Sequence, residues 1–199
     1  NRAVENINLI NKNKEFEKKL FYSYSLIGDS ENIKNIRDQI KKISISESRV
    51  FINGPTGSGK ELIARKIHKE SKRKKEPFTV LNGALLDIKK YELELFGEEK
   101  KDGSISYGAL EKSNRGILLI DEVSEIPLET QSKILRVLID QKFKRINGNH
   151  DINVDVRIIC LSSKDIKKEI ENGNFREDLY HRLNVFEINI QPLKKRVSD

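Results

Sequence analysis

The sequence has one cysteine, no methionine and no apolar run near the roughly 18 residues that a membrane-spanning helix requires. A single cysteine excludes an internal disulfide framework and a zinc site built from thiolates. Because Cys160 stands within an apolar stretch, we predict that it is a small core residue. No signal peptide opens the sequence, so we expect a cytoplasmic protein without a membrane partner. The missing methionine and the start at Asn1 lead us to expect a piece of a longer polypeptide.

The composition fits one folded domain and part of another. Among 199 residues, 36 % are hydrophobic and 35 % are charged, which leaves enough apolar side chains for a packed core. The net charge of +7 permits a nucleotide or nucleic-acid partner without requiring one. We interpret the basic run Lys72–Lys75 as a solvated loop rather than a DNA contact. His68, His150 and His181 lack the spacing of metal ligands, so no zinc site is expected.

Short apolar runs alternate with stretches of helical periodicity along most of the chain. The expected helices span about 30–43, 59–70, 85–96, 128–140, 164–171 and 175–183, and the expected strands 50–52, 78–81, 117–120, 154–161 and 185–190. This alternation predicts an α/β fold with a mostly parallel sheet sandwiched between helices. Ligands of such sheets lie at the carboxyl ends of the strands. Residues 1–22 have irregular helical spacing, which fits either a short connecting helix or a dimerising linker from an upstream domain.

The strongest motif follows the strand expected at 50–52 and opens the next helix. It consists of Gly54, Pro55, Thr56, Gly57, Ser58, Gly59 and Lys60. Glycines let a loop wrap closely around phosphate oxygens, which then face backbone N–H groups and a helix N-terminus, and the lysine supplies a positive charge. A glycine-rich turn that carries a lysine by chance is the alternative. Glu61 departs from the general pattern, which has Ser or Thr there as a Mg²⁺ ligand.

A second motif ends the apolar run Ile117–Ile120 with Asp121 and Glu122. Downstream of a phosphate loop, the first acid is expected to hold Mg²⁺ and the second to orient and deprotonate the attacking water. Solvated carboxylates at a strand end are the alternative interpretation.

Several motifs in order resemble one family. The segments are Gly54–Glu61, Leu95–Gly97, Leu118–Glu122 and Phe175–Leu183. Together they resemble the AAA+ ATPase domain of sigma-54-dependent transcription activators, from about Leu26 to the end of the chain. Glutamate after the loop lysine is usual in that family. Gly108–Glu111, Arg136–Asp140 and the pair Tyr180 and His181 are similar to the NtrX branch of response regulators.

The resemblance implies an AAA+ P-loop NTPase fold that binds ATP or ADP with Mg²⁺. It places Leu26, Ile27 and Gly28 beside the adenine, and Asn82 as a residue that restrains Glu122. The metal would be held by Asp121.

Two arginines match those that reach the ATP of a neighbouring subunit, Arg176 and Arg182. Ordinary helix ion pairs with Glu177 or Asp178 are the alternative for both.

Two departures concern contact with the sigma factor and with phosphate. Family members that contact sigma-54 carry a Gly-Ala-Phe-Thr-Gly-Ala loop soon after Leu-Phe-Gly, whereas Glu98–Tyr107 lacks it and is shorter. We therefore do not count sigma-54 as an expected partner. Ser163 stands where the family usually has asparagine, and a serine reaches less far toward a phosphate-side water.

The resemblance also suggests how the chain is organised. Residues 1–22 would be a linker helix from an upstream receiver domain, 23–191 the ATPase core, and 192–199 the start of a helical lid that is otherwise absent. A cognate histidine kinase and promoter DNA would bind domains outside this chain. The chain itself would pair through the linker helix and form a ring with ATP. The expected function is an ATPase of a bacterial transcription regulator, with turnover weak without the lid, and the alternative is a nucleotide-gated oligomerisation switch without sigma-54 remodelling.

Overall fold

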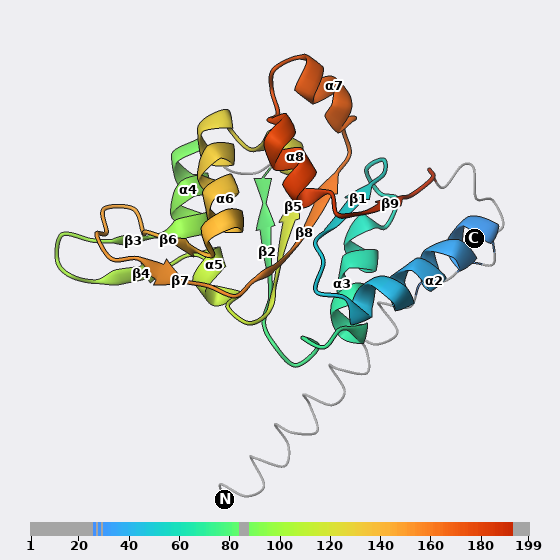
Figure 1. Cartoon of the computed structure of the whole chain (residues 1–199), viewed down its shortest axis with the longest axis horizontal. Helices are drawn as coiled ribbons and strands as arrows, with labels where there is room; N and C mark the ends of the chain where they lie inside the picture. Colours follow the sequence, from blue (N-terminus) through green and yellow to red (C-terminus); the bar gives the residue numbers. More distant parts are fainter. Residues whose placement is uncertain (1–25, 27, 29, 84–87, 193–199) are drawn as a thin grey trace, which may run out of the picture.

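The computed structural model describes residues 26, 28, 30–83 and 88–192, so the expectations for 1–22, Ile27 and 193–199 lie outside the described residues. A five-stranded sheet in the order β2-β5-β8-β1-β9 forms the centre of the molecule, and all neighbouring strands run parallel (Figure 1). Its strands are β1 (Val50–Asn53), β2 (Phe78–Asn82), β5 (Ile117–Asp121), β8 (Arg157–Ser162) and β9 (Phe186–Asn189). The predicted parallel sheet between helices is confirmed.

Helices cover both faces of the sheet. One face packs against α2 (Glu31–Ile45) and α3 (Lys60–Glu70), and the other against α4 (Ile88–Phe96), α5 (Ala109–Lys112), α6 (Leu128–Asp140) and α8 (Glu177–Leu183). Successive side chains of β5 alternate between two buried clusters. Ile117 and Leu119 join the cluster of α2 and α3, whereas Leu118 and Ile120 join the other. A strand buried on both faces explains the continuous apolar run in its sequence.

Helix α2 forms as its sequence predicts. The Oγ atom of Ser30 accepts a hydrogen bond of 3.3 Å from the backbone N–H of Ile33, which caps the helix. The four isoleucines expected on one face are buried against the sheet, namely Ile33, Ile36, Ile40 and Ile43.

Some predicted boundaries are wrong; tertiary hydrogen bonds explain one of them and a local helix cap explains another. The strand predicted from Val154 begins at Arg157, because the N–H of Val154 bonds instead to the carbonyl of Gln141 and that of Asp155 to the side chain of Asn114. The helix predicted from residue 164 is α7 (Ile166–Glu171), which Asp165 caps. Helices α3 and α8 begin one and two residues later than predicted, and β9 is shorter by one residue at each end. The start predicted at residue 85 for the helix that contains α4 lies outside the described residues.

Two short hairpins were not predicted. They are β3 (Gly97–Glu99) with β4 (Ile105–Tyr107), and β6 (Lys142–Phe143) with β7 (Ile152–Asn153). Arg145 joins them, because its guanidinium bonds to both carboxylate oxygens of Glu111 and to Glu99 at 2.6–2.9 Å. Its guanidinium carbon also lies 5.4 Å from the ring centroid of Tyr107. The β3–β4 hairpin is therefore attached to the loop between β6 and β7 through the side chain of Arg145.

The basic run at 72–75 is only partly a solvated loop. Arg73 donates hydrogen bonds to Glu47, to Asp155 and to the carbonyl of Gly116, and only 15 % of its side chain is exposed. The three lysines of the run are exposed, as predicted. Among the described residues, no helix has the length and apolar character needed to cross a membrane.

Candidate functional site

The phosphate loop joins β1 to α3 at the carboxyl edge of the sheet. Gly57 and Gly59 have φ values of 76° and 93°, a left-handed conformation that glycine adopts without strain. Gly59 occupies the N-cap of α3 without a side-chain cap, so the first N–H groups of the helix face the loop. This conformation presents backbone donors and the positive end of a helix dipole to an anion.

Lys60 lies inside this loop and is almost fully buried. Its Nζ atom donates to the carbonyl oxygen of Gly54 at 2.8 Å and to that of Pro55 at 3.4 Å. The same Nζ lies 3.7 Å from Oε1 of Glu122. The loop and the acidic motif, more than 60 residues apart in sequence, therefore meet at one point.

The two acids follow the central strand β5. Asp121 accepts a hydrogen bond of 3.0 Å from the N–H of Glu122. Burial, and then the negative charge of Glu122, raise the pKa of Asp121 above its ordinary value. Glu122 itself adopts a left-handed φ of 50°, a conformation that is strained for a residue with a side chain. A carboxylate whose charge is disfavoured by burial and by an adjacent carboxylate fits a divalent cation, because the cation would stabilise that charge.

Ser163 bonds directly to the second acid. Its N–H and its Oγ donate to the same oxygen, Oε2 of Glu122, at 3.0 and 2.7 Å. Asn82 ends β2, where its register partner on β5 is Asp121. The contact predicted between Asn82 and Glu122 stays a prediction, and the contact with Ser163 is one that the sequence did not reveal.

The two arginines differ in their surroundings. Arg176 forms a two-bonded ion pair with Asp178 at 2.6 and 2.9 Å, as the alternative interpretation expected. Arg182 is exposed and makes no ion pair with any described residue. Burial of Arg49, and then the positive charge of the nearby Arg182, lower the pKa of Arg49.

The backbone next to Arg176 depends on a buried glutamine that sequence reasoning missed. Gln131 on α6 accepts from the N–H of Arg176 at 2.8 Å and donates to the carbonyls of Ile126 and Asn174. A polar residue at an inward position of an amphipathic helix was the signal available in the sequence.

The remaining described residues of the prediction contact arginines on α2 and α3. Glu61 faces Arg65 one helical turn later, in an ion pair of 2.6 Å. Leu26 and Gly28 are tied to α2, because Arg37 donates to both of their carbonyl oxygens at 2.8 and 2.6 Å. Sequence reasoning missed this role of Arg37, which places Leu26 and Gly28 of the predicted adenine segment against α2.

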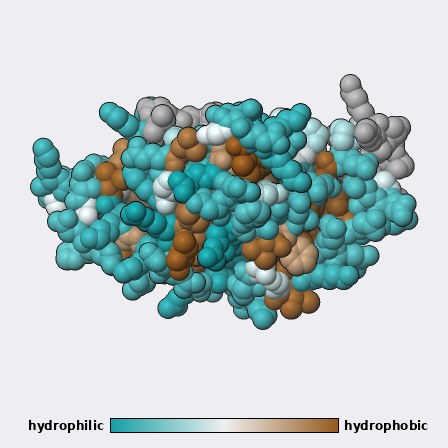
Figure 2. Space-filling view, turned by 45° about the horizontal axis from the view of Figure 1, so that its top comes forward, coloured by the Kyte–Doolittle hydropathy of each residue, from teal (hydrophilic) through white to brown (hydrophobic). Residues whose placement is uncertain are grey.

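Two hollows are relevant to ligand binding. One, of about 490 Å³, borders the phosphate loop at Gly54 and Pro55 and continues past Ser163 toward Tyr180 and Glu187. The face of the molecule in Figure 2 is largely hydrophilic, with several separate hydrophobic areas between the polar side chains.

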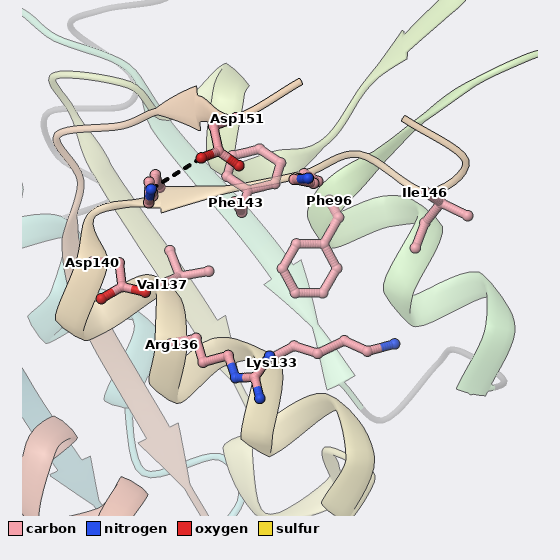
Figure 3. Close-up of a pocket in the computed structure, with 10 residues that line it drawn as sticks. Phe96, Lys133, Arg136, Val137, Asp140, Phe143, Ile146 and Asp151 are labelled. Carbon is pink, nitrogen blue, oxygen red and sulfur yellow. Dashed lines mark hydrogen bonds and ion pairs between the residues drawn. The ribbon is translucent and has the colours of Figure 1, made fainter. Parts of the chain in front are cut away.

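The other hollow, of about 340 Å³, lies between α6 and the β6–β7 hairpin (Figure 3). Phe96 and Phe143 lie within it, and Arg136 and Lys133 approach it from α6. It contains neither the phosphate loop nor the two acids, so it is separate from the candidate site.

The comparisons with known proteins agree on one family. The sigma-54 interaction domain matches residues 26–189. The nitrogen assimilation regulatory protein NtrX of Azorhizobium caulinodans is 42 % identical over 199 residues, which cover all of this chain and 44 % of that protein. The crystal structure of NtrX from Brucella abortus in complex with ADP superposes with a TM-score of 0.89 at 40 % identity, over 98 % of this chain and 44 % of that one.

The same Brucella protein in complex with ATP gives a TM-score of 0.86 at 40 % identity, over 98 % of this chain and 45 % of that one. The chain thus spans less than half the length of these relatives.

Proposed function

Because this chain belongs to the family of sigma-54 interaction domains, we propose that it binds ATP or ADP and hydrolyses ATP as part of a bacterial transcription regulator. The observation that carries the proposal is the meeting of Lys60 with Glu122 at 3.7 Å, beside a phosphate loop at the carboxyl edge of a parallel sheet. A chance glycine-rich turn would not place a buried lysine against the acids of another strand. The ADP and ATP complexes of the Brucella relative, at 40 % identity, support the same ligand class.

Each residue has a proposed role in this reaction. The backbone N–H groups of the loop bind the phosphates, and Lys60 moves from the carbonyls of Gly54 and Pro55 to the terminal phosphates. Asp121 would hold Mg²⁺, which when bound neutralises developing charge on the phosphates. Glu122 orients a water and accepts its proton. Asn82 is proposed to restrain Glu122 before it takes up this position.

We also propose that the chain acts with copies of itself. An exposed arginine can contribute to ATP hydrolysis only if the phosphates of a bound ATP lie next to it, and a neighbouring copy of the chain would bring them there. Arg182 is the stronger candidate for reaching a neighbour's ATP, since it makes no ion pair among the described residues, whereas Arg176 is engaged by Asp178. A ring of chains would bring such an arginine to each phosphate. The linker helix at 1–22, the lid after 192, the histidine kinase and the promoter DNA remain parts of this proposal that concern residues or domains outside the described structure.

The role of Glu122 is tested by Glu122→Gln. The amide cannot accept a proton, so turnover should fall by about a hundredfold or more, while the affinity for ATP stays within about twofold. Glu125→Gln is the matched control, because this acid lies on the same turn and pairs only with Lys164 at the surface among the described residues. Undiminished turnover in Glu122→Gln contradicts the assigned role.

The arginine is tested by mixing two inactive variants. Glu122→Gln lacks the base but keeps Arg182, and Arg182→Ala lacks the arginine but keeps the base. If Arg182 acts on a neighbour, the mixture regains activity that neither variant has alone, and activity per chain rises with protein concentration. Arg136→Ala, another exposed arginine without an ion pair in the described part of the chain, should be active alone. Binding without turnover at every concentration, in all mixtures, would favour the nucleotide-gated switch instead.

A further inference from the structure

Ser163 and Glu122 form a contact in which both donors of the serine converge on one oxygen. The N–H lies 3.0 Å and the Oγ 2.7 Å from Oε2, and we refer to this pair of bonds as the resting contact. Two donors occupy the two lone pairs of a carboxylate oxygen, so a water can no longer donate to that oxygen. The atom that would accept the proton of an attacking water is therefore already engaged.

The turn that carries Ser163 is itself braced. Ser162 is fully buried at the end of β8, its Oγ donates to the carbonyl of Lys164 at 2.9 Å, and it accepts from the N–H of Lys164 at 3.2 Å. Neighbouring serines thus have different tasks. Ser162 closes the turn, and the closed turn directs the N–H and the Oγ of Ser163 toward β5.

The other oxygen of Glu122 is also engaged. Oε1 lies 3.7 Å from Nζ of Lys60, which donates to two carbonyls of its own loop. A continuous chain of contacts therefore runs from Ser163 through Glu122 and Lys60 to Gly54. Lys60 and Glu122, the two charged groups of this chain of contacts, are thus both engaged by the protein itself, and the backbone of Glu122 is left-handed.

We propose that Ser163 is a positioning residue that retains Glu122 in a resting position, and that release of the resting contact accompanies formation of the reacting state. This inference rests on the proposed function and concerns the regulation of the same site. Phosphate oxygens compete for Lys60 and so free Oε1, but they leave the bonds to Oε2 intact. Ser163 therefore sets how readily Glu122 turns to the attacking water.

Ser163→Ala tests the inference, because it removes the Oγ donor and keeps the backbone donor. Loss of one hydrogen bond to a charged acceptor should favour release by about tenfold. The affinity for ADP with aluminium fluoride and Mg²⁺, a probe of the reacting state, should rise by that factor, while the affinity for ADP alone stays unchanged. Where turnover is measured, kcat should rise and KM for ATP should change little.

Two further variants serve as controls. Ser163→Thr keeps both donors and should behave as the unaltered chain. Ser104→Ala removes a contact of the same kind, since the N–H and Oγ of Ser104 donate to one oxygen of Asp102 at 2.9 and 2.7 Å, on the distant β3–β4 turn. It should leave both affinities unchanged.

The possible results separate this inference from the proposed function. If Ser163→Ala binds the aluminium fluoride complex no better than the unaltered chain, or less well, the resting contact does not restrain Glu122 and the inference is wrong, while the proposed function stands. If the unaltered chain does not bind ADP, the proposed function fails and the inference fails with it.

Discussion

At the scale of single residues, position within the sheet decides the chemistry of the side chains. Cys160 is fully buried in β8, and Asp121 and Glu122 emerge one residue apart at the end of β5. The same apolar sheet thus makes one thiol inaccessible and presents two carboxylates to a ligand. Burial raises the pKa of both Cys160 and Asp121. It keeps the thiol protonated and unreactive, whereas it makes the carboxylate a better partner for a cation.

Cys160 should therefore be almost unreactive toward thiol reagents in the folded protein. Burial raises the pKa of its thiol, so the reactive thiolate is disfavoured. An ordinary thiol with a pKa of about 8.5 is labelled faster when the pH rises from about 7 to 9, and the labelling of Cys160 should not show this increase. The measurement is the labelling rate across this pH range, with the urea-unfolded chain as the control. Rapid labelling that follows pH in the folded state would show that β8 is not packed as described.

The sequence identified the motifs of the candidate site but not how their residues contact one another. The phosphate loop and the two acids are local motifs, so their residue types and flanking apolar runs suffice to find them. The contact of Ser163 with Glu122 depends on the pairing of β5 with β8 and on the turn closed by Ser162. Such a contact joins residues 41 positions apart, and no local pattern encodes it.

At the scale of elements, burial explains which were predicted. The continuous apolar run of β5 and the isoleucine stripe of α2 reflect packing against a core, so they are visible in the sequence. Strand β3 consists of Gly97, Glu98 and Glu99, which have little intrinsic preference for a strand. Its pairing is fixed by Arg145, which comes from a distant part of the chain.

Arg145 should consequently be required for the stability of the hairpin region. Arg145→Ala leaves Glu99 and Glu111 without their cationic partner in a mostly buried position, and should lower the free energy of unfolding by about 3 kcal/mol. Arg145→Lys should recover only part of this loss, because lysine cannot make the two-bonded contact with Glu111.

Urea unfolding measures both variants of Arg145. Lys142→Ala is the matched control, since it breaks the ion pair with Asp151, in which both side chains are about half exposed. Its loss should lower the free energy of unfolding by less than about 1 kcal/mol. Equal effects of Arg145→Ala and Lys142→Ala would contradict a structural role for Arg145.

At the scale of the whole molecule, nucleotide binding should couple to folding stability. A ligand that binds only the folded state at about 100 times its dissociation constant stabilises that state by about 2.7 kcal/mol. Thermal unfolding with and without ATP or ADP should show this shift for the unaltered chain. The shift should be lost in Lys60→Ala, which removes the buried cation of the loop, and kept in Lys41→Ala, whose lysine lies exposed on α2.

A Lys60→Ala variant that keeps the full shift would mean that nucleotide binds elsewhere on the chain. The comparison is between each variant with and without nucleotide, because removing Lys60 also alters the stability of the free protein through its bonds to Gly54 and Pro55.

The strand order also constrains how the chain reaches its fold during synthesis. Strand β1 emerges before the other strands of the described sheet, yet its two neighbours are β8 and β9, and Val50 pairs with Ile159 and Phe186. At about 5–20 residues per second on the ribosome, the apolar side chains and the unpaired backbone of β1 stay without a strand partner for on the order of ten seconds. The nascent chain thus carries an unpaired apolar strand while the roughly 100 residues between β1 and β8 are synthesised. Temporary shielding by α2 and α3, which are made on either side of β1, would be the chain's own protection against aggregation.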